Sequence, residues 1–167
     1  IAFIIFILIL FVAIFAPFVA PTNPYDLASV DIMNSRLSPG TEDFSGNTFW
    51  LGTDGAGRDM VSAIFYGLRV SLGVGVLSGL IALTIGAFFG ISAAFFRGKY
   101  ETFVMRVVDI QLSFPSILLA LIIIAAFGKG VDKTIIALIL VQWAYYARTA
   151  RASALVEMNK ELSLIHI

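Results

Sequence analysis

The stretch VSLGVGVLSGLIALTIGAFFGISAAFF, from Val70 to Phe96, contains no charged residue. Arg69 precedes it, and Arg97 and Lys99 follow it. A helix that crosses a bilayer needs about 20 mainly apolar residues, because the hydrocarbon core is about 30 Å thick and a helix rises about 1.5 Å per residue. This stretch therefore predicts a membrane-spanning helix and, with it, an all-α membrane protein.

Three further segments are candidate spans. The first, Ile1 to Ala20, is uncharged and is followed by Pro21, with Pro17 near its end. A signal peptide is the alternative, but the basic start and small-residue cleavage site that it needs are not visible. Spans are also predicted from about Phe103 to Phe127 and from about Thr134 to Ala147. The last is short and ends in Gln142, Trp143, Tyr145 and Tyr146, so a buried or re-entrant helix remains the alternative there.

The overall composition agrees with a membrane environment. The 167 residues are 59% hydrophobic and 13% charged, with a mean hydropathy of +0.96. Soluble domains carry about a quarter charged residues. The formal net charge is zero, which argues against a nucleic-acid partner, and the absence of cysteine excludes thiolate metal sites. The chain begins with Ile1 inside an apolar run, so a fragment or processed product is expected.

The loop 21–69 and the basic residues predict the orientation. Lys and Arg favour the cytoplasmic side of a membrane. They occur after the second span at Arg97, Lys99 and Arg106, and after the fourth at Arg148, Arg151 and Lys160. The N-terminus is therefore predicted inside, the long loop 21–69 outside, and residues 148–167 as a cytoplasmic tail.

The polar stretch GTDGAGRDM, Gly52 to Met60, fits none of three chemical loops. A Walker A loop needs Lys followed by Ser or Thr after its last glycine, whereas Arg58 and Asp59 stand there. The carboxylate spacing is wrong for an EF-hand, and only half of a Rossmann fingerprint is present. Asp59 is instead a good N-cap for a short amphipathic helix near 60–68 that leads into the second span. A capped turn at the membrane surface is the main prediction.

Two features inside the spans predict packing. Gly75 and Gly79, and Gly86 and Gly90, have the four-residue spacing that lets helices approach closely, in this chain or against another subunit. In the third span, Arg106 and Asp109 are three residues apart, share a helical face and can pair, while Pro115 should kink the helix.

Catalytic, metal and cofactor sites are not expected. No predicted span has Asp, Glu or His at its centre, and the single histidine is His166. A secondary transporter would favour an intramembrane carboxylate or broken repeats, and a membrane-embedded enzyme would need paired catalytic groups at one depth.

Several motifs together resemble one permease family. Leu51-Gly52-Thr53-Asp54, Gly57-Arg58-Asp59, Ser62, Tyr66-Gly67, Arg69 and Ser71-Leu72 resemble its LGTDxxGRDxxSRxxYGxRxSL signature. Gly86, Gly90, Met105 to Asp109, Phe114-Pro115 and Leu118 to Ala120 agree with it, as do Trp143, Ala147-Arg148, Arg151 and Leu155. The family is the second permease subunit of ABC importers for dipeptides, oligopeptides and nickel.

The resemblance implies a protein of the bacterial or archaeal cytoplasmic membrane with six spans, of which about four are present. It implies a sibling permease, two cytoplasmic ABC ATPases, an extracytoplasmic binding protein and no covalent chemistry in the permease itself. The motif on the outer loop, formed by Gly52, Thr53, Asp54, Gly57, Arg58 and Asp59, is called the outer-loop motif. It would lie on the side that meets the binding protein, or it would brace the helices against the sibling subunit.

The resemblance weakens at the C-terminal end. Arg148, Arg151, Leu155, Glu157 and Glu161 approach the family's ATPase-coupling segment, but Leu162 to Ile167 replace its expected residues. The resemblance therefore predicts a truncated chain that does not transport by itself. An unrelated polytopic transporter or a non-functional fragment is the alternative.

Overall fold

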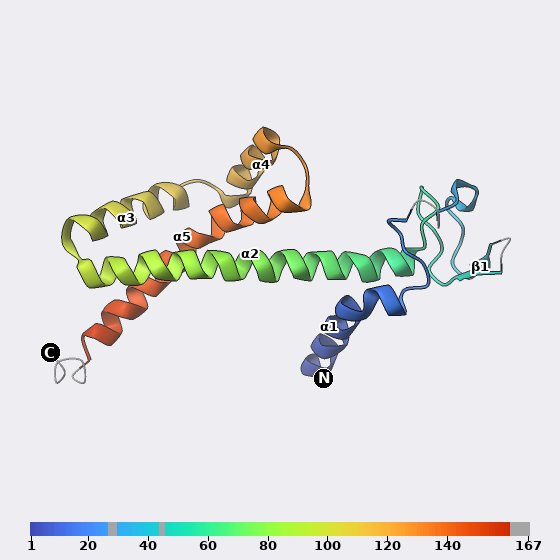
Figure 1. Ribbon diagram of the computed structural model, residues 1–167, viewed down its shortest axis with the longest axis horizontal. Coiled ribbons are helices and arrows are strands. Elements are labelled where there is room, and N and C mark those ends of the chain that lie inside the picture. Colours follow the sequence, from blue (N-terminus) through green and yellow to red (C-terminus); the bar gives the residue numbers. More distant parts are fainter. Residues whose placement is uncertain (27–29, 44–45, 161–167) are drawn as a thin grey trace. The chain divides into compact units, whose positions relative to one another are not determined.

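The computed structural model describes residues 1–26, 30–43 and 46–160, which form two compact units, Ile1–Gly73 and Val74–Ile167 (Figure 1). The described residues are mainly helical, with one very short strand pair. The all-α class predicted from the apolar runs is therefore confirmed, and each unit is described by itself.

In the first unit, helix α1 (Ala2–Val19) has almost all of its large apolar side chains exposed. Such a surface is suited to lipid rather than water. Pro17 lies inside α1, and the helix is followed by Ala20, whose backbone is extended. Pro17 and Pro21, which mark the predicted end, lie two residues before the last helical residue and two residues after it.

The loop that follows has little regular structure. A single 3₁₀ turn, η1 (Ile32–Asn34), begins at Asp31, whose side chain accepts a hydrogen bond from the Met33 N–H at 2.9 Å. Strands β1 (Thr41–Glu42) and β2 (Thr48–Phe49) pair antiparallel, with Thr41 opposite Phe49. Residues 27–29 and 44–45 of this loop lie outside the described residues.

Helix α2 (Met60–Phe96) has 37 residues and runs through the end of one unit into the other. Residues 60–68 are helical, but they form no element of their own: the turn capped by Asp59 continues directly into the span. Nothing between Met60 and Val70 breaks a helix, since Gly67 is tolerated inside one. At about 1.5 Å per residue α2 is about 55 Å long, which exceeds the thickness of a hydrocarbon core.

In the second unit, the predicted third span is broken in two. Helix α3 (Gly98–Leu112) and helix α4 (Ser116–Phe127) meet at 86°, which is a break rather than a kink within 103–127. Pro115 has no N–H to donate and disfavours the helical conformation at the residue before it. Helix α3 also begins before the apolar run, because Arg97 and Gly98 adopt positive φ and reverse the chain directly after α2.

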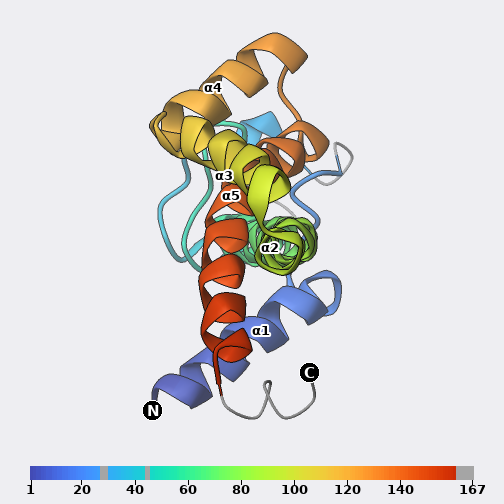
Figure 2. The same cartoon turned by 90° about the vertical axis from the view of Figure 1, so that its left-hand side faces the viewer.

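Helix α5 (Val131–Met158) extends well beyond the predicted span 134–147. The segment after Ala147 contains no Gly or Pro, so polarity ends the apolar run without ending the helix. Residues 148–158, predicted as the start of a cytoplasmic tail, are therefore helical. Helix α5 packs on both α3 and α4 (Figures 1 and 2). Val108, Ala144 and Ala147 form a small buried core.

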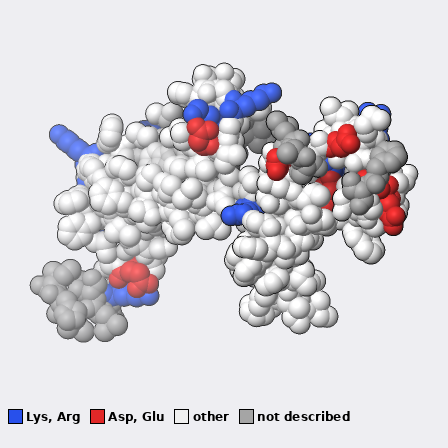
Figure 3. Space-filling model, turned by 45° about the vertical axis from the view of Figure 1, so that its right-hand side comes forward, with Lys and Arg blue, Asp and Glu red and all other residues white. Residues whose placement is uncertain are grey.

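Within the described residues, two helices, α1 and α2, are long and apolar enough to cross a membrane. The count becomes three when the bent pair α3 and α4 is taken as one span. The space-filling view is mainly white over the helical surfaces, with the charged side chains in small groups (Figure 3). This is the surface of a membrane protein.

Candidate functional site

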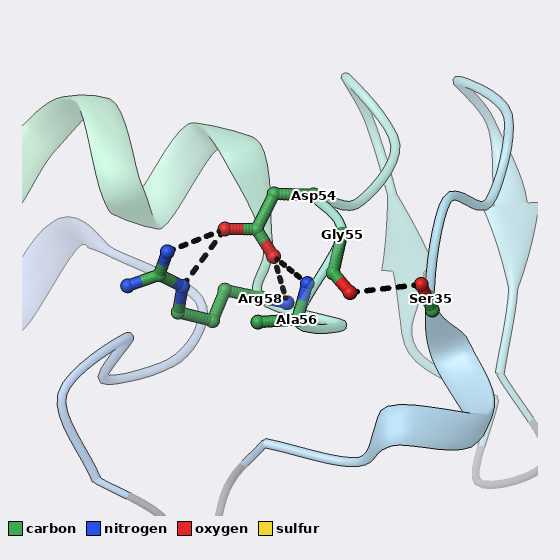
Figure 4. A network of polar contacts seen from close by, with 5 residues as sticks. All are labelled: Ser35, Asp54, Gly55, Ala56 and Arg58. Carbon is green, nitrogen blue, oxygen red and sulfur yellow. Dashed lines mark hydrogen bonds and ion pairs between the residues drawn. The ribbon is translucent and has the colours of Figure 1, made fainter.

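The turn from Asp54 to Arg58 folds around the carboxylate of Asp54 (Figure 4). One Asp54 oxygen accepts the backbone N–H groups of Ala56 at 2.8 Å and Arg58 at 3.0 Å. The other contacts the Arg58 guanidinium, with the Nε donating at 2.8 Å. The hydrogen bond from the Arg58 N–H is the main cause that lowers the pKa of Asp54, and the guanidinium adds to it. Asp54 therefore acts as an internal clamp of its own turn.

Thr53 joins this turn to the segment before it. Its hydroxyl accepts the Leu37 N–H at 2.8 Å and donates to the Asn34 carbonyl, while its own N–H donates to Leu37 O at 3.2 Å. The flanking Ser35 hydroxyl donates to Gly55 O at 3.0 Å (Figure 4). The threonine is nearly buried, so these bonds satisfy polar groups that water does not reach.

Two glycines make this close approach possible. Gly52 has φ +75° and Gly57 has φ +82°. A Cβ on Gly52 would stand 2.3 Å from Leu37 O, and a Cβ on Gly57 would stand 2.1 Å from Asp31 O. Both positions therefore need glycine for conformation and for space.

Asp59 caps α2, as predicted from sequence. Its carboxylate accepts the Ser62 N–H at 2.8 Å and the Ser62 hydroxyl at 2.6 Å. Ser62 is fully buried, and its oxygen accepts the Thr22 N–H at 3.0 Å. The chain just after α1 is thereby bonded to the first turn of α2. Sequence reasoning did not identify this role of Thr22, since the two partners are 40 residues apart.

The outer-loop motif is thus a closed structural unit. Each of its polar side chains, in Thr53, Asp54, Arg58 and Asp59, bonds to a neighbouring segment or to its own turn. No cluster of three or more His, Cys, Asp or Glu that could hold a metal occurs among the described residues. The geometry is that of an architectural turn.

The second unit brings one of the two glycine pairs against another helix. Gly86 and Gly90 are buried on α5: a Cβ on Gly86 would lie 2.6 Å from Trp143 O, and one on Gly90 would lie 2.3 Å from Ala147 O. For Gly75 and Gly79, a Cβ would meet no described atom within 4 Å. Only the second pair serves packing between the helices described here.

Ion pairs join α3 to α5. Asp109 pairs with Arg148, and Glu101 accepts from the Arg151 Nε at 2.7 Å. The sequence placed Arg106 within reach of Asp109 on the same helix, but the ion-pair partner of Asp109 is Arg148 of α5. Arg106 lies instead beside a polar pocket of about 230 Å³ that Glu101, Asp109 and Arg151 also line.

Gln111 adds a third polar link between these helices, and sequence reasoning gave it no such role. Its amide donates to Leu140 O and accepts the Trp143 indole N–H at 2.9 Å. Gln111 also borders a groove of about 400 Å³ between α3, α4 and α5, whose other lining residues are apolar. Pro115 stands at the break between α3 and α4, next to this groove.

The approach to the predicted coupling segment is the end of α5. Leu155 is half-buried there, and Glu157 is exposed and pairs with Lys160 at 2.6 Å. Glu161 and Leu162 to Ile167 lie outside the described residues.

Comparisons with known proteins agree with this arrangement. Residues 82–164 match the family described as binding-protein-dependent transport system inner membrane component. Residues 1–39 match the N-terminal TM domain of oligopeptide transport permease C.

Individual relatives span nearly the whole chain. It is 38% identical to the di/tripeptide transport system permease protein of Pseudomonas aeruginosa (strain UCBPP-PA14) over 156 residues, which is 93% of this chain and 50% of that protein. It is 36% identical to the nickel transport system permease protein of Escherichia coli (strain K12), over 84% of this chain and 49% of that protein. It is 32% identical to the oligopeptide transport system permease protein of Bacillus subtilis (strain 168), over 96% of this chain and 50% of that protein. The chain spans about half the length of the curated relatives it matches. It belongs to the ABC importer permease family that includes these peptide and nickel permeases.

Proposed function

We propose that this chain is part of a permease subunit of an ATP-driven importer and forms part of the path through which peptides or nickel cross the cytoplasmic membrane. One observation carries the proposal: the two family models match the chain in order. The second matched region, residues 82–164, contains Gly86 and Gly90 of α2 and the part of α5 that they contact. The permease contributes shape and movement, and it has no catalytic role.

The proposed topology has four crossings. Helix α1 runs outward, α2 returns, α3 with α4 forms one broken crossing, and α5 returns again. The basic residues Arg97, Lys99, Arg148 and Arg151 then lie on the cytoplasmic side, as the distribution of positive charge favours. The loop that carries Asp54 and Asp59 lies outside.

The proposed partners follow from this topology. The outer-loop motif braces α1 and α2 on the side where a binding protein delivers substrate. The open glycine face at Gly75 and Gly79 is suited to a helix of a sibling permease, because small residues let backbones approach closely in lipid. The C-terminal part of α5, with Leu155 and Glu157, leads toward the surface that two cytoplasmic ATPases would drive.

Purification of the tagged protein from its own cells tests these partners. After crosslinking in the intact membrane and extraction in mild detergent, mass spectrometry is expected to find a second permease and P-loop ATPases in fixed ratio. The purified complex is expected to hydrolyse ATP. An unrelated tagged ATPase complex, carried through the same procedure, controls for loss of subunits. If that complex stays intact but the tagged protein is recovered without any ATPase, the proposal is contradicted.

A further inference from the structure

The polar links between α3 and α5 form an ordered series. Along α3 they involve Glu101, Asp109 and Gln111, and along α5 their partners are Arg151, Arg148 and Trp143 in that order. Positions rise along one helix while they fall along the other, so the two helices are antiparallel neighbours. The three links extend over most of the length of α3.

The apolar contact between these helices cannot fix their register alone. The fully buried core there consists of Val108, Ala144 and Ala147, with Met105, Leu112 and Trp143 partly buried against it. Apolar burial has no direction, and lipid provides little hydrophobic drive between helices. Charged and amide partners, in contrast, bond only at one register.

The environment strengthens the link between Glu101 and Arg151 most, because the side chains of Asp109 and Arg148 are 57% and 55% exposed and better solvated. The side chains of Glu101 and Arg151 are 21% and 32% exposed. Coulomb attraction grows as the surroundings become less like water, and loss of one partner leaves the other charge poorly solvated. Sliding α3 along α5 would therefore leave Glu101 and Asp109 without their guanidinium partners.

We propose that these links fasten α3 and α5 into one body that moves as a unit during transport, with Glu101 and Asp109 as positioning residues. The inference rests on the proposed function and deepens it. Movement at the C-terminal end of α5 then reaches the break at Pro115 through α3.

A removable tether tests this proposal. The chain has no cysteine, so Glu101→Cys with Arg151→Cys introduces one defined thiol pair. A direct disulfide needs Cβ atoms about 3.5–4.5 Å apart, closer than an acid and a guanidinium that meet tip to tip. The tether is therefore a short bis-methanethiosulfonate reagent, which dithiothreitol releases. Uptake of labelled dipeptide or nickel is measured in vesicles that contain the intact importer.

Before tethering, the cysteine pair is expected to lower ATP-dependent uptake about fivefold or more, as loss of a coupling contact does. The tether should restore most of the uptake, and dithiothreitol should remove the gain. The single variants Glu101→Cys and Arg151→Cys, treated with the same reagent, should show no gain. Full uptake without the tether, or uptake that stays low with it, would overturn the proposal.

The exchanged pair Glu101→Arg with Arg151→Glu provides a second test that needs no reagent. It is expected to recover uptake relative to Glu101→Arg alone, at equal amounts of assembled complex. No recovery in the exchanged pair would count against an ion-pair role. Absence of ATP-dependent uptake with the wild-type protein would contradict the proposed function. This inference, in contrast, is tested only by how uptake with the variants differs from uptake with the wild type.

Discussion

Gly90 of α2 lies so close to Ala147 of α5 that a Cβ on the glycine would stand 2.3 Å from the Ala147 carbonyl oxygen. A backbone atom cannot turn aside as a side chain can. The contact therefore requires glycine at this position.

Gly90→Ala should destabilise the second unit, because α2 and α5 must separate to admit the methyl group. Overpacking of this kind costs about 1–3 kcal/mol. Gly73→Ala is the matched control, since its Cβ would meet no described atom within 4 Å. Thermal unfolding in detergent is expected to show a lower midpoint for Gly90→Ala and an unchanged or higher one for Gly73→Ala. Equal midpoints for the two variants would contradict the packing.

Gly57→Ala should disrupt the outer-loop turn more than Gly46→Ala does. Both glycines have φ +82°, so alanine is strained at both by about 1–2 kcal/mol. Only at Gly57 does the Cβ also meet a backbone oxygen, Asp31 O at 2.1 Å. The difference in proteolysis rate of the loop between the two variants therefore isolates the steric effect. Similar rates would show that the turn does not hold segment 31–37 as described.

Asp59→Ala should loosen the start of α2. Loss of an N-cap costs about 0.5–2 kcal/mol, and here the buried Ser62 hydroxyl also loses its acceptor. Hydrogen exchange should become faster at the first turn of α2, near Val61 and Ser62, and remain unchanged in α5. Unchanged exchange at Ser62 would argue against the cap.

The outer-loop turn should depend on pH through Asp54. Because folding lowers the pKa of Asp54, its contribution is fully present above the unfolded value of about 3.9 and is lost as the pH falls through the folded pKa. Protection of the Ala56 and Arg58 amides against exchange should therefore decrease only below about pH 4. Asp54→Asn should show lower protection at neutral pH and a weaker acid response. A response centred near pH 6 would implicate another group.

Local rules predicted the parts of the structure that depend on neighbouring residues. Asp59 caps α2 because a carboxylate accepts the free N–H groups of its own first turn, and Pro115 interrupts its helix because it lacks an N–H. The break of 86° exceeds a kink, and both α3 and α4 pack on α5.

Partners distant in sequence were not accessible to such rules. Asp109 has Arg106 three residues away and Arg148 39 residues away, and only the fold determines that Arg148 is the partner. The two glycine pairs have the same spacing, yet only Gly86 and Gly90 face α5. Hydropathy likewise located the apolar part of α5 but not its helical continuation from Arg148 to Met158.

ATP-dependent uptake is the most direct test of the proposed permease. Vesicles from cells with and without the gene for this protein are loaded with ATP, given the cognate binding protein, and supplied with labelled dipeptide or nickel. We expect uptake that requires ATP, the binding protein and the gene together. Uptake that is equal without the gene, or that proceeds on a proton gradient without ATP, would contradict the account.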